Sequence, residues 1–315
     1  MSGLRIVFCG TPQFAVPSLK HLLSQKDFEI ASVITQPDRA RGRGQKVATS
    51  PVKEAALAAG VAVHQPEKMR MPEAETLLRE LKPDAIVIIA YGQIIPERLL
   101  NIPRLGWINL HASLLPKYRG AAPINWAIAN GEERTGLTTM KIDAGMDTGE
   151  MLLQHEVGIG PKETAPALAV RLAEAGAALI AETLRGLSAG SIHGRPQNDA
   201  GASYAPLLKK KDGKIAWERT ARQIFDRMRG FAPWPGAFSA FRGQSCHLWG
   251  EPAADENTDA QPGTLIPAQK ELYVACGSRS ILRLQRVKLE GRNEVQAAEF
   301  ARGARLAAGE RFDEE

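Results

Sequence analysis

Residues 84–90, with the sequence DAIVIIA, are the part of the chain that decides the fold. The four residues from Ile86 to Ile89 are all apolar and show no alternation with polar residues. A strand with one face in water alternates between apolar and polar residues, whereas a strand covered on both faces is apolar throughout. The run therefore predicts a buried strand in a parallel sheet with helices on both faces.

Strand and helix patterns alternate on both sides of this run, as expected for repeated βαβ units. The first strand leads into a helix that tolerates Pro17 in its first turn, and Gly60 ends a second, alanine-rich helix. The order predicts a Rossmann-like α/β domain with a mostly parallel sheet. The expected strands are residues 4–9, 30–34, 61–63, 84–90 and 107–111, and the expected helices are residues 14–23, 51–59 and 73–81.

A dinucleotide site after the first strand is disfavoured. The strand is followed by Gly10, but Pro12 and Ala15 occupy the positions where the glycine-spaced phosphate motif has its second and third glycines. We therefore do not expect a nicotinamide cofactor.

The predicted strand 107–111 carries two polar residues on one face. Side chains two apart in a strand point the same way, so Asn109 and His111 project together. Polar groups on an otherwise apolar face need hydrogen-bond partners or a function. Because ligands of open α/β sheets bind beyond the carboxyl ends of the strands, His111 and the Tyr91-Gly92 pair are expected in one crevice.

A carboxylate follows downstream, at Asp147, flanked by Gly145 and Gly149. Glycines permit close backbone approach, which a site loop often requires, although Asp and Gly are also ordinary turn residues. An amide and an imidazolium stabilise negative charge that develops on a carbonyl oxygen, and a carboxylate takes a proton or orients the imidazole. The three residues Asn109, His111 and Asp147 are thus candidates for acyl transfer to an amine. No serine or cysteine beside His111 has the setting of an activated nucleophile, which favours direct transfer.

The motif Asn-x-His-x-Ser-Leu-Leu-Pro-x-Tyr-Arg-Gly at residues 109–120, with Asp-x-Gly-Met-Asp-Thr-Gly at residues 143–149, resembles the formyltransferases that use 10-formyltetrahydrofolate. The resemblance extends over nearly the whole chain. It includes residues 5–15, 35–39, 42–44, 90–92 and 231–236.

The resemblance implies a site for the formyl donor. It assigns the catalytic roles to Asn109, His111 and Asp147, and 10-formyltetrahydrofolate is the implied cosubstrate, with no metal. The residues expected to contact the folate are Ile89, Tyr91, Gly92, Ser113, Leu114, Leu115 and Pro116.

The second half of the chain completes the first domain and adds a second one. Strands are expected at residues 136–142 and 150–159 and a long helix at 164–187, followed by a glycine-rich stretch. Short apolar runs separated by turn residues then predict a small barrel or sandwich, and the resemblance implies a barrel similar to the oligonucleotide-binding fold. A helix is expected at 219–229 and an exposed loop at 251–263. We predict a catalytic domain at residues 1–187, a linker at 188–208 and a C-terminal domain at 209–315.

Basic clusters are candidates for contacts with nucleic-acid phosphates, because such contacts follow local patches. The segment 39–46 contains Arg39, Arg41, Arg43 and Lys46 without an acid, and is expected to be a flexible loop. In the resembled family the matching loop lies near the acceptor end of a tRNA. Further candidates are Lys209, Lys210 and Lys211, the helix with Arg219, Arg222, Arg227 and Arg229, and Lys117 and Arg119 beside the folate segment. For each of these, a solvated surface position is the alternative.

Composition agrees with a globular protein. The chain has 315 residues, a net charge of +5, 44% hydrophobic and 24% charged residues, which fits two domains. The three cysteines are too far apart for a metal-ligand motif, and neither a secretory signal nor a membrane-spanning run is evident. We expect a cytoplasmic monomer.

Three functions fit the sequence. The one favoured by the resemblance and the basic clusters is formyl transfer to the amine of methionine on initiator methionyl-tRNA, in translation initiation. The second is a related formyltransferase or formyltetrahydrofolate hydrolase that acts on a small amine or water. The third is an RNA-binding protein with an inactive α/β domain.

Overall fold

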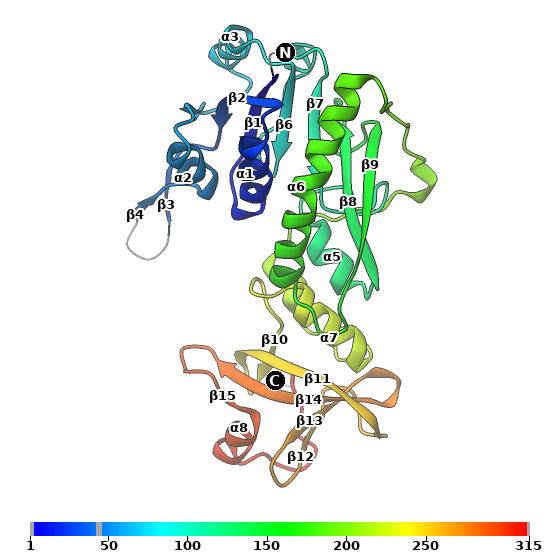
Figure 1. The fold of residues 1–315 in the computed structure, drawn as a ribbon. Helices are drawn as coiled ribbons and strands as arrows, with labels where there is room; N and C mark the ends of the chain where they lie inside the picture. Colours follow the sequence, from blue (N-terminus) through cyan, green and yellow to red (C-terminus); the bar gives the residue numbers. More distant parts are fainter. Residues whose placement is uncertain (1–2, 42–45, 314–315) are drawn as a thin grey trace. The chain divides into compact units, whose positions relative to one another are not determined.

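The computed structural model describes residues 3–41 and 46–313 (Figure 1). The chain divides into two compact units. Unit 1 consists of residues 1–123, 134–158 and 168–206, and unit 2 consists of residues 124–133, 159–167 and 207–315. The chain thus passes from unit 1 to unit 2 more than once.

Unit 1 contains a sheet with the strand order β5-β2-β1-β6-β7-β8-β9. The strands from β5 to β7 are parallel, whereas β8 runs antiparallel to β7 and β9 antiparallel to β8. The predicted α/β class with a mostly parallel sheet is confirmed. The bounds are β1 Leu4–Gly10, β2 Phe28–Ile34, β5 Val63–His64, β6 Ala85–Ile89, β7 Trp107–His111, β8 Arg134–Lys141 and β9 Met151–Gly158.

The strand β6 is buried at every residue, as its apolar sequence predicts. One face of the sheet, which carries Val7 and Ile86, packs against Leu78 of α3 and Leu99 of α4. On the other face, α6 comes so close that a Cβ on Gly176 would meet the Leu110 side chain at 2.5 Å. Helices therefore lie on both faces of the sheet. The helices of this part of the chain are α1 Val16–Ser24, α2 Pro51–Ala58, α3 Pro72–Leu81, α4 Glu97–Leu100 and α6 Ala165–Ala189, with η1 at Gln13–Ala15.

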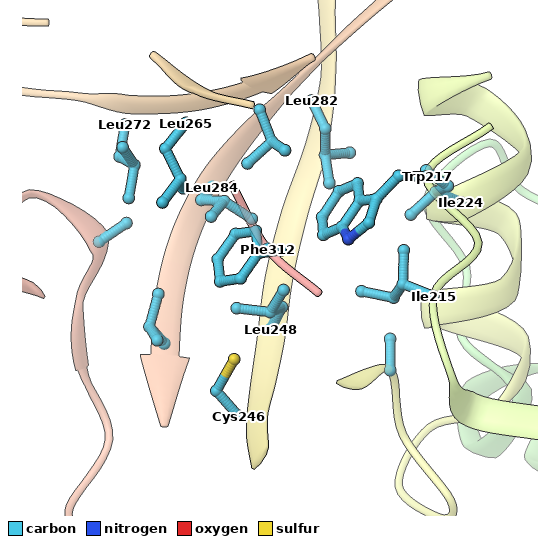
Figure 2. Packing of buried hydrophobic residues seen from close by; sticks show 14 of the residues in the cluster. Ile215, Trp217, Ile224, Cys246, Leu248, Leu265, Leu272, Leu282, Leu284 and Phe312 are labelled. Carbon is cyan, nitrogen blue, oxygen red and sulfur yellow. The ribbon is translucent and has the colours of Figure 1, made fainter. Parts of the chain in front are cut away.

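Unit 2 is built on an antiparallel sheet with the order β10-β11-β14-β13-β12, and β15 also pairs with β14. Leucines from its strands enclose the stacked rings of Trp217 and Phe312, whose centroids are 5.3 Å apart (Figure 2). No pairing joins β10 to β12 within the described residues, so the sheet is open. Its elements are α5 Pro123–Ala129, η3 Lys210–Gly213, α7 Ala221–Gly230, β10 Phe238–Phe241, β11 Gln244–Asn257, β12 Leu265–Pro267, β13 Leu272–Ala275, β14 Ser280–Leu289, β15 Val295–Gln296 and α8 Ala297–Ala304.

The helix α7 is held by segments from earlier in the chain. Thr220 caps its N-terminus by accepting a hydrogen bond from the backbone N–H of Gln223. Near its end, the buried Arg229 donates to the backbone carbonyls of Gly160 and Glu163, and Asn125 donates to the carbonyl of Gly230. These contacts explain why residues 124–133 and 159–167 belong to unit 2.

Two predicted loops contain strands instead. Residues 251–257 continue β11, because Glu251 and Pro252 pair with Arg283 and Leu282 after a bulge. The basic segment begins and ends in the hairpin strands β3 Arg39–Arg41 and β4 Lys46–Ala48.

The glycine-rich stretch after α6 lies within unit 1 up to residue 206. Arg195 forms an antiparallel bridge with Met151, and Tyr204 a parallel bridge with Arg119. The division into residues 1–187, 188–208 and 209–315 stays a prediction. Across the described residues, no helix is both long and apolar enough to cross a bilayer.

Candidate active site

The strand β7 sets the directions of Asn109 and His111. Its register against β6 pairs Trp107 with Ile86 and Asn109 with Ile88, so these side chains lie on the face covered by α3 and α4. Ile108 and Leu110 point to the opposite face, toward α6. Asn109 is partly exposed and His111 is buried. The two predicted polar side chains therefore share one face.

The loop after β8 brings a carboxylate to this face. Lys141 pairs with Ile108, so the loop starts near the amino end of β7 and turns back for Asp147 to reach Asn109 and His111. Asp143 stabilises the turn by accepting hydrogen bonds from the N–H of Gly145 and the hydroxyl of Thr148. Asp147 itself has a φ of 55°, which is uncommon for a residue with a side chain.

The carboxylate of Asp147 lies among three nitrogen atoms. The backbone N–H of Gly120 donates to Oδ2 at 2.8 Å, and Asn109 Nδ2 is 3.5 Å from Oδ1. His111 Nδ1 is 3.6 Å from Oδ2. The backbone contact fixes the carboxylate, and the two side chains approach it at longer distances.

One hydrogen bond orients the imidazole ring of His111. Its Nε2 lies 2.9 Å from the carbonyl oxygen of Tyr118. A carbonyl only accepts, so Nε2 is the donor of this hydrogen bond. The other ring nitrogen, Nδ1, therefore faces Asp147.

The segment after β7 is fixed by hydrogen bonds to β8 and β9. The Ser113 hydroxyl donates to the carbonyl of Lys117 at 2.6 Å, so it is not paired with His111 as a nucleophile. The N–H of Leu115 donates to Thr138 Oγ1, and its carbonyl accepts from Gln154. The backbone of residues 113–116 is therefore held rigidly beside the three candidate catalytic residues.

The backbone of the Asp147 loop is held by a residue that the sequence did not single out. Gln197 donates through Nε2 to the carbonyls of Asp147 and Gly149, both at 2.8 Å. Its Oε1 accepts two hydrogen bonds from the buried Arg119, which also pairs with Asp199 at 2.7 Å. Arg119 is 3% exposed and is held by Gln197 and Asp199, so it is not the exposed cation that the sequence suggested for a phosphate contact. No pattern in the sequence marked Gln197, which lies in the predicted linker.

The other residues predicted to contact the folate, at the end of β6, lie in different settings. Ile89 is buried on the α6 face of the sheet, opposite to Asn109. The ring of Tyr91 lies in the core, and its hydroxyl has no hydrogen-bond partner among the described residues. Burial raises the pKa of this phenol. Only the Tyr91 backbone faces the polar groups here, since its carbonyl accepts from Thr11 and Gln36, and Gly92 has a φ of 83°.

The basic residues predicted to contact phosphates lie in other segments of the chain than the candidate catalytic residues. The side chains of Arg39, Arg41 and Lys46, and the whole of Arg43, fall outside what the structure describes. Lys209, Lys210 and Lys211 are exposed at η3. In α7, by contrast, Arg229 is buried against Asp226, and Arg227 is partly buried and donates to the carbonyl of Asp212. These two arginines are therefore not the surface cations that the sequence suggested. The described residues contain no group of three or more His, Cys, Asp or Glu side chains that could hold a metal ion.

Comparisons with known proteins agree with this fold. The Formyl transferase family matches residues 4–184, and Formyl transferase, C-terminal domain, matches residues 207–305. A solved sugar 3N-formyl transferase, studied with dTDP and 5-N-formyl-THF, has a TM-score of 0.65 and 19% identity, over 93% of this chain and 100% of its own. The chain belongs to the formyl transferase family.

Two relatives align with this chain over nearly the full length of both chains. Methionyl-tRNA formyltransferase from Solibacter usitatus is 51% identical over 99% of both chains. Methionyl-tRNA formyltransferase from Geobacter metallireducens is 48% identical, also over 99% of both chains.

Proposed function

We propose that this protein transfers the formyl group of 10-formyltetrahydrofolate to the α-amino group of methionine on initiator methionyl-tRNA. The observation that carries the proposal is the position of the Asp147 carboxylate beside Asn109 and His111 of β7. Its oxygens lie 3.5 Å from Asn109 Nδ2 and 3.6 Å from His111 Nδ1. The names of the full-length relatives support the same substrates.

The three side chains have distinct roles in this reaction. The amine attacks the formyl carbon, and negative charge develops on the formyl oxygen. Asn109 Nδ2–H and the protonated His111 Nδ1–H stabilise that charge. Asp147 takes the proton that the amine loses, directly or through water, or it orients His111. The oxyanion then collapses, the bond from the formyl carbon to N10 breaks, and N10 leaves as an amine with the proton that the attacking amine lost.

The donor site follows from the rigid segments around these residues. Ser113, Leu114, Leu115 and Pro116 offer a fixed backbone for the folate, and Gly92 offers close backbone approach on the neighbouring strand end. Ile89 and Tyr91 contribute through their backbone, because the side chains of both are buried. Thr11 and Gln36, which hold the Tyr91 carbonyl, keep this edge in place.

The tRNA site is assigned to the basic clusters. Arg39, Arg41, Arg43 and Lys46 supply one group of cations, and Lys209, Lys210 and Lys211 another. Neutralising Arg39, Arg41 and Arg43 together should weaken tRNA use and reduce its dependence on salt, since fewer counterions are released. Binding of the formyl donor should not change. We expect a monomer, which a light-scattering mass would test, that works in the cytoplasm with the translation machinery.

The test is a formylation assay with the purified full-length chain. The protein is incubated with 10-formyltetrahydrofolate and initiator methionyl-tRNA, and acid-stable formyl-methionine is measured. Asp147→Asn and His111→Ala should each lower the single-turnover rate by at least about 100-fold, in line with losses of a general base or an oxyanion donor. Near-normal rates in either variant would contradict the role assigned to that residue.

Product with a small amine but none with the tRNA would instead support the alternative acceptor. Release of formate without any acceptor would indicate a hydrolase.

A further inference from the structure

One face of the sheet in unit 2 carries a row of rings. In β10 and β11, Phe238 pairs with His247, and the ring centroids are 5.8 Å apart. Trp249 follows two residues after His247, with a centroid distance of 6.3 Å. Cys246 and Leu248, which flank His247 in the strand, point into the core (Figure 2). We call Phe238, His247 and Trp249 the aromatic row; each of them is partly exposed.

Cations surround the aromatic row. In the register of β11 and β14, Lys288 lies opposite His247, and Arg286 lies opposite Trp249. The guanidinium of Arg286 is 4.9 Å from the centre of the Trp249 ring. Lys210 begins η3, which packs beside Phe238, because a Cβ on Gly213 would come within 3.2 Å of a ring carbon of Phe238. Burial, followed by the charges of Lys288 and Lys210, lowers the pKa of His247.

A further exposed ring lies in the segment that leads into β10. Trp234 is 56% exposed and lies between Pro233 and Pro235. Two residues later, Gly236 packs against His247, where a Cβ would come within 3.2 Å of Nδ1. A large exposed aromatic side chain on a proline-restricted turn contributes little to the fold and loses little entropy when a ligand covers it.

Three of the acidic groups near this face already have partners. Glu294 forms an ion pair with Arg286, Glu251 pairs with Lys162, and Asp212 accepts a hydrogen bond from the backbone N–H of Lys209. The face therefore offers aromatic surface and positive charge together. This combination binds unpaired nucleotides, because bases stack on rings while cations hold the phosphates.

We propose that Trp234 and the aromatic row form a stacking surface for unpaired nucleotides of the RNA substrate, with Lys210 and Lys288 at the phosphates. The choice of RNA as the partner rests on the proposed function. The stacking itself adds a contact with bases that the basic clusters alone do not provide.

Binding of two labelled RNAs to the full-length protein tests this surface. The probes are a single-stranded octauridine and an RNA duplex of the same length, measured by fluorescence anisotropy. Trp249→Leu and Trp234→Leu should each weaken octauridine binding by about 5- to 150-fold, the range for loss of one stacked base. Duplex binding should change less than about twofold, because the duplex presents no free bases.

Matched variants separate stacking from general effects. Tyr273→Leu removes an aromatic ring from β13 of the same sheet, and we expect it to bind octauridine like the wild type. Lys288→Ala should lower the slope of log affinity against log salt by about 1, whereas the exposed Lys270→Ala should not.

A measurement on the unmodified chain avoids any loss of folding in the variants. Photo-crosslinking with 5-bromouridine octamers, followed by mass spectrometry, should place the crosslinks on Trp234, His247 or Trp249. Crosslinks only elsewhere, or equal loss of octauridine and duplex binding in the tryptophan variants, would overturn the proposal.

The experiments distinguish a failure of this surface from a failure of the proposed function. A wild-type protein that fails to formylate methionyl-tRNA contradicts that function, while octauridine binding still tests the surface. Active tryptophan variants with unchanged kcat/KM for the tRNA would overturn the surface as an RNA contact in the reaction, and the proposed function would stand.

Discussion

At the residue scale, Gly149 shows how a missing side chain positions the carboxylate. A Cβ at this residue would lie 1.9 Å from the carbonyl oxygen of Lys141. The loop that carries Asp147 closes through this contact, and the carbonyl of Gly149 also accepts from Gln197. The loop can therefore take its conformation only with glycine here.

Gly149→Ala should accordingly destabilise the protein by about 1–3 kcal/mol, the usual cost of inserting a methyl group into a packed position. It should also lower kcat for formylation, because the displaced loop moves Asp147. Urea unfolding and the formylation assay measure the two effects. Gly158→Ala is the matched control, since a Cβ at Gly158 meets nothing within 4 Å. Equal unfolding midpoints for the two variants would refute the steric argument.

The three cysteines are all shielded from solvent in the native protein. All are buried, and burial raises the pKa of Cys246 and Cys276 to about 12 and raises that of Cys9 as well. A thiol reacts as its thiolate, so the native protein should react slowly with a disulfide reagent at pH 8. Full reaction of all three cysteines should appear only after unfolding in urea.

The same shifts make stability depend on pH. Above the ordinary thiol pKa of 9.0, the unfolded chain loses protons that the native chain keeps. Stability should therefore fall as the pH rises from about 9 toward 12. The double variant Cys246→Ala and Cys276→Ala should show a smaller fall between pH 8 and 10 than the wild type. Parallel curves would show that other groups cause the pH dependence.

At the scale of elements, the segment after α6 supports the candidate site. Its backbone pairs with residues 119 and 151, and its Gln197 bridges the Asp147 loop to Arg119. An amide is required here because one end donates to two carbonyls while the other accepts from a guanidinium.

Gln197→Glu tests this bridge. The carboxylate keeps the contact with Arg119 but faces the carbonyls of Asp147 and Gly149 without a donor, so we expect a loss of kcat of about tenfold or more with a small change in KM. The neighbouring Asn198→Ala, which loses only a local cap at Ala200, should retain activity. A variant with a normal kcat and pH profile would show that the bridge only stabilises the fold.

The elements also show what the sequence could and could not predict. The strands from β1 to β9 that build the sheet were predictable, because burial on both faces and alternation at Asn109 and His111 leave a direct signal in the residues. The short helices α4, α5 and α8 were not predicted, since four to eight residues carry little periodicity. The contact between Gln197 and Asp147 was beyond reach, because its partners are backbone carbonyls that any residue could supply.

At the scale of the whole molecule, unit 2 depends on segments that interrupt unit 1 in the sequence. Residues 124–133 lie between β7 and β8, and residues 159–167 between β9 and the main part of α6. Their anchor is the buried pair of Asp226 and Arg229, whose carboxylate oxygen and Nε are 2.8 Å apart. Asp226 also pairs with the exposed Arg222 at 3.1 Å.

Asp226→Asn should therefore destabilise unit 2 by about 3–5 kcal/mol, because Arg229 stays buried without its counter-charge. Arg222→Ala removes only the exposed partner and should cost less than about 1 kcal/mol. Hydrogen exchange by mass spectrometry should show faster exchange in α7 and in residues 124–133 and 159–167, while β1, β6 and β7 stay protected. Faster exchange confined to residues 207–315 would show that the earlier segments fold with unit 1, and that the C-terminal residues form a unit by themselves.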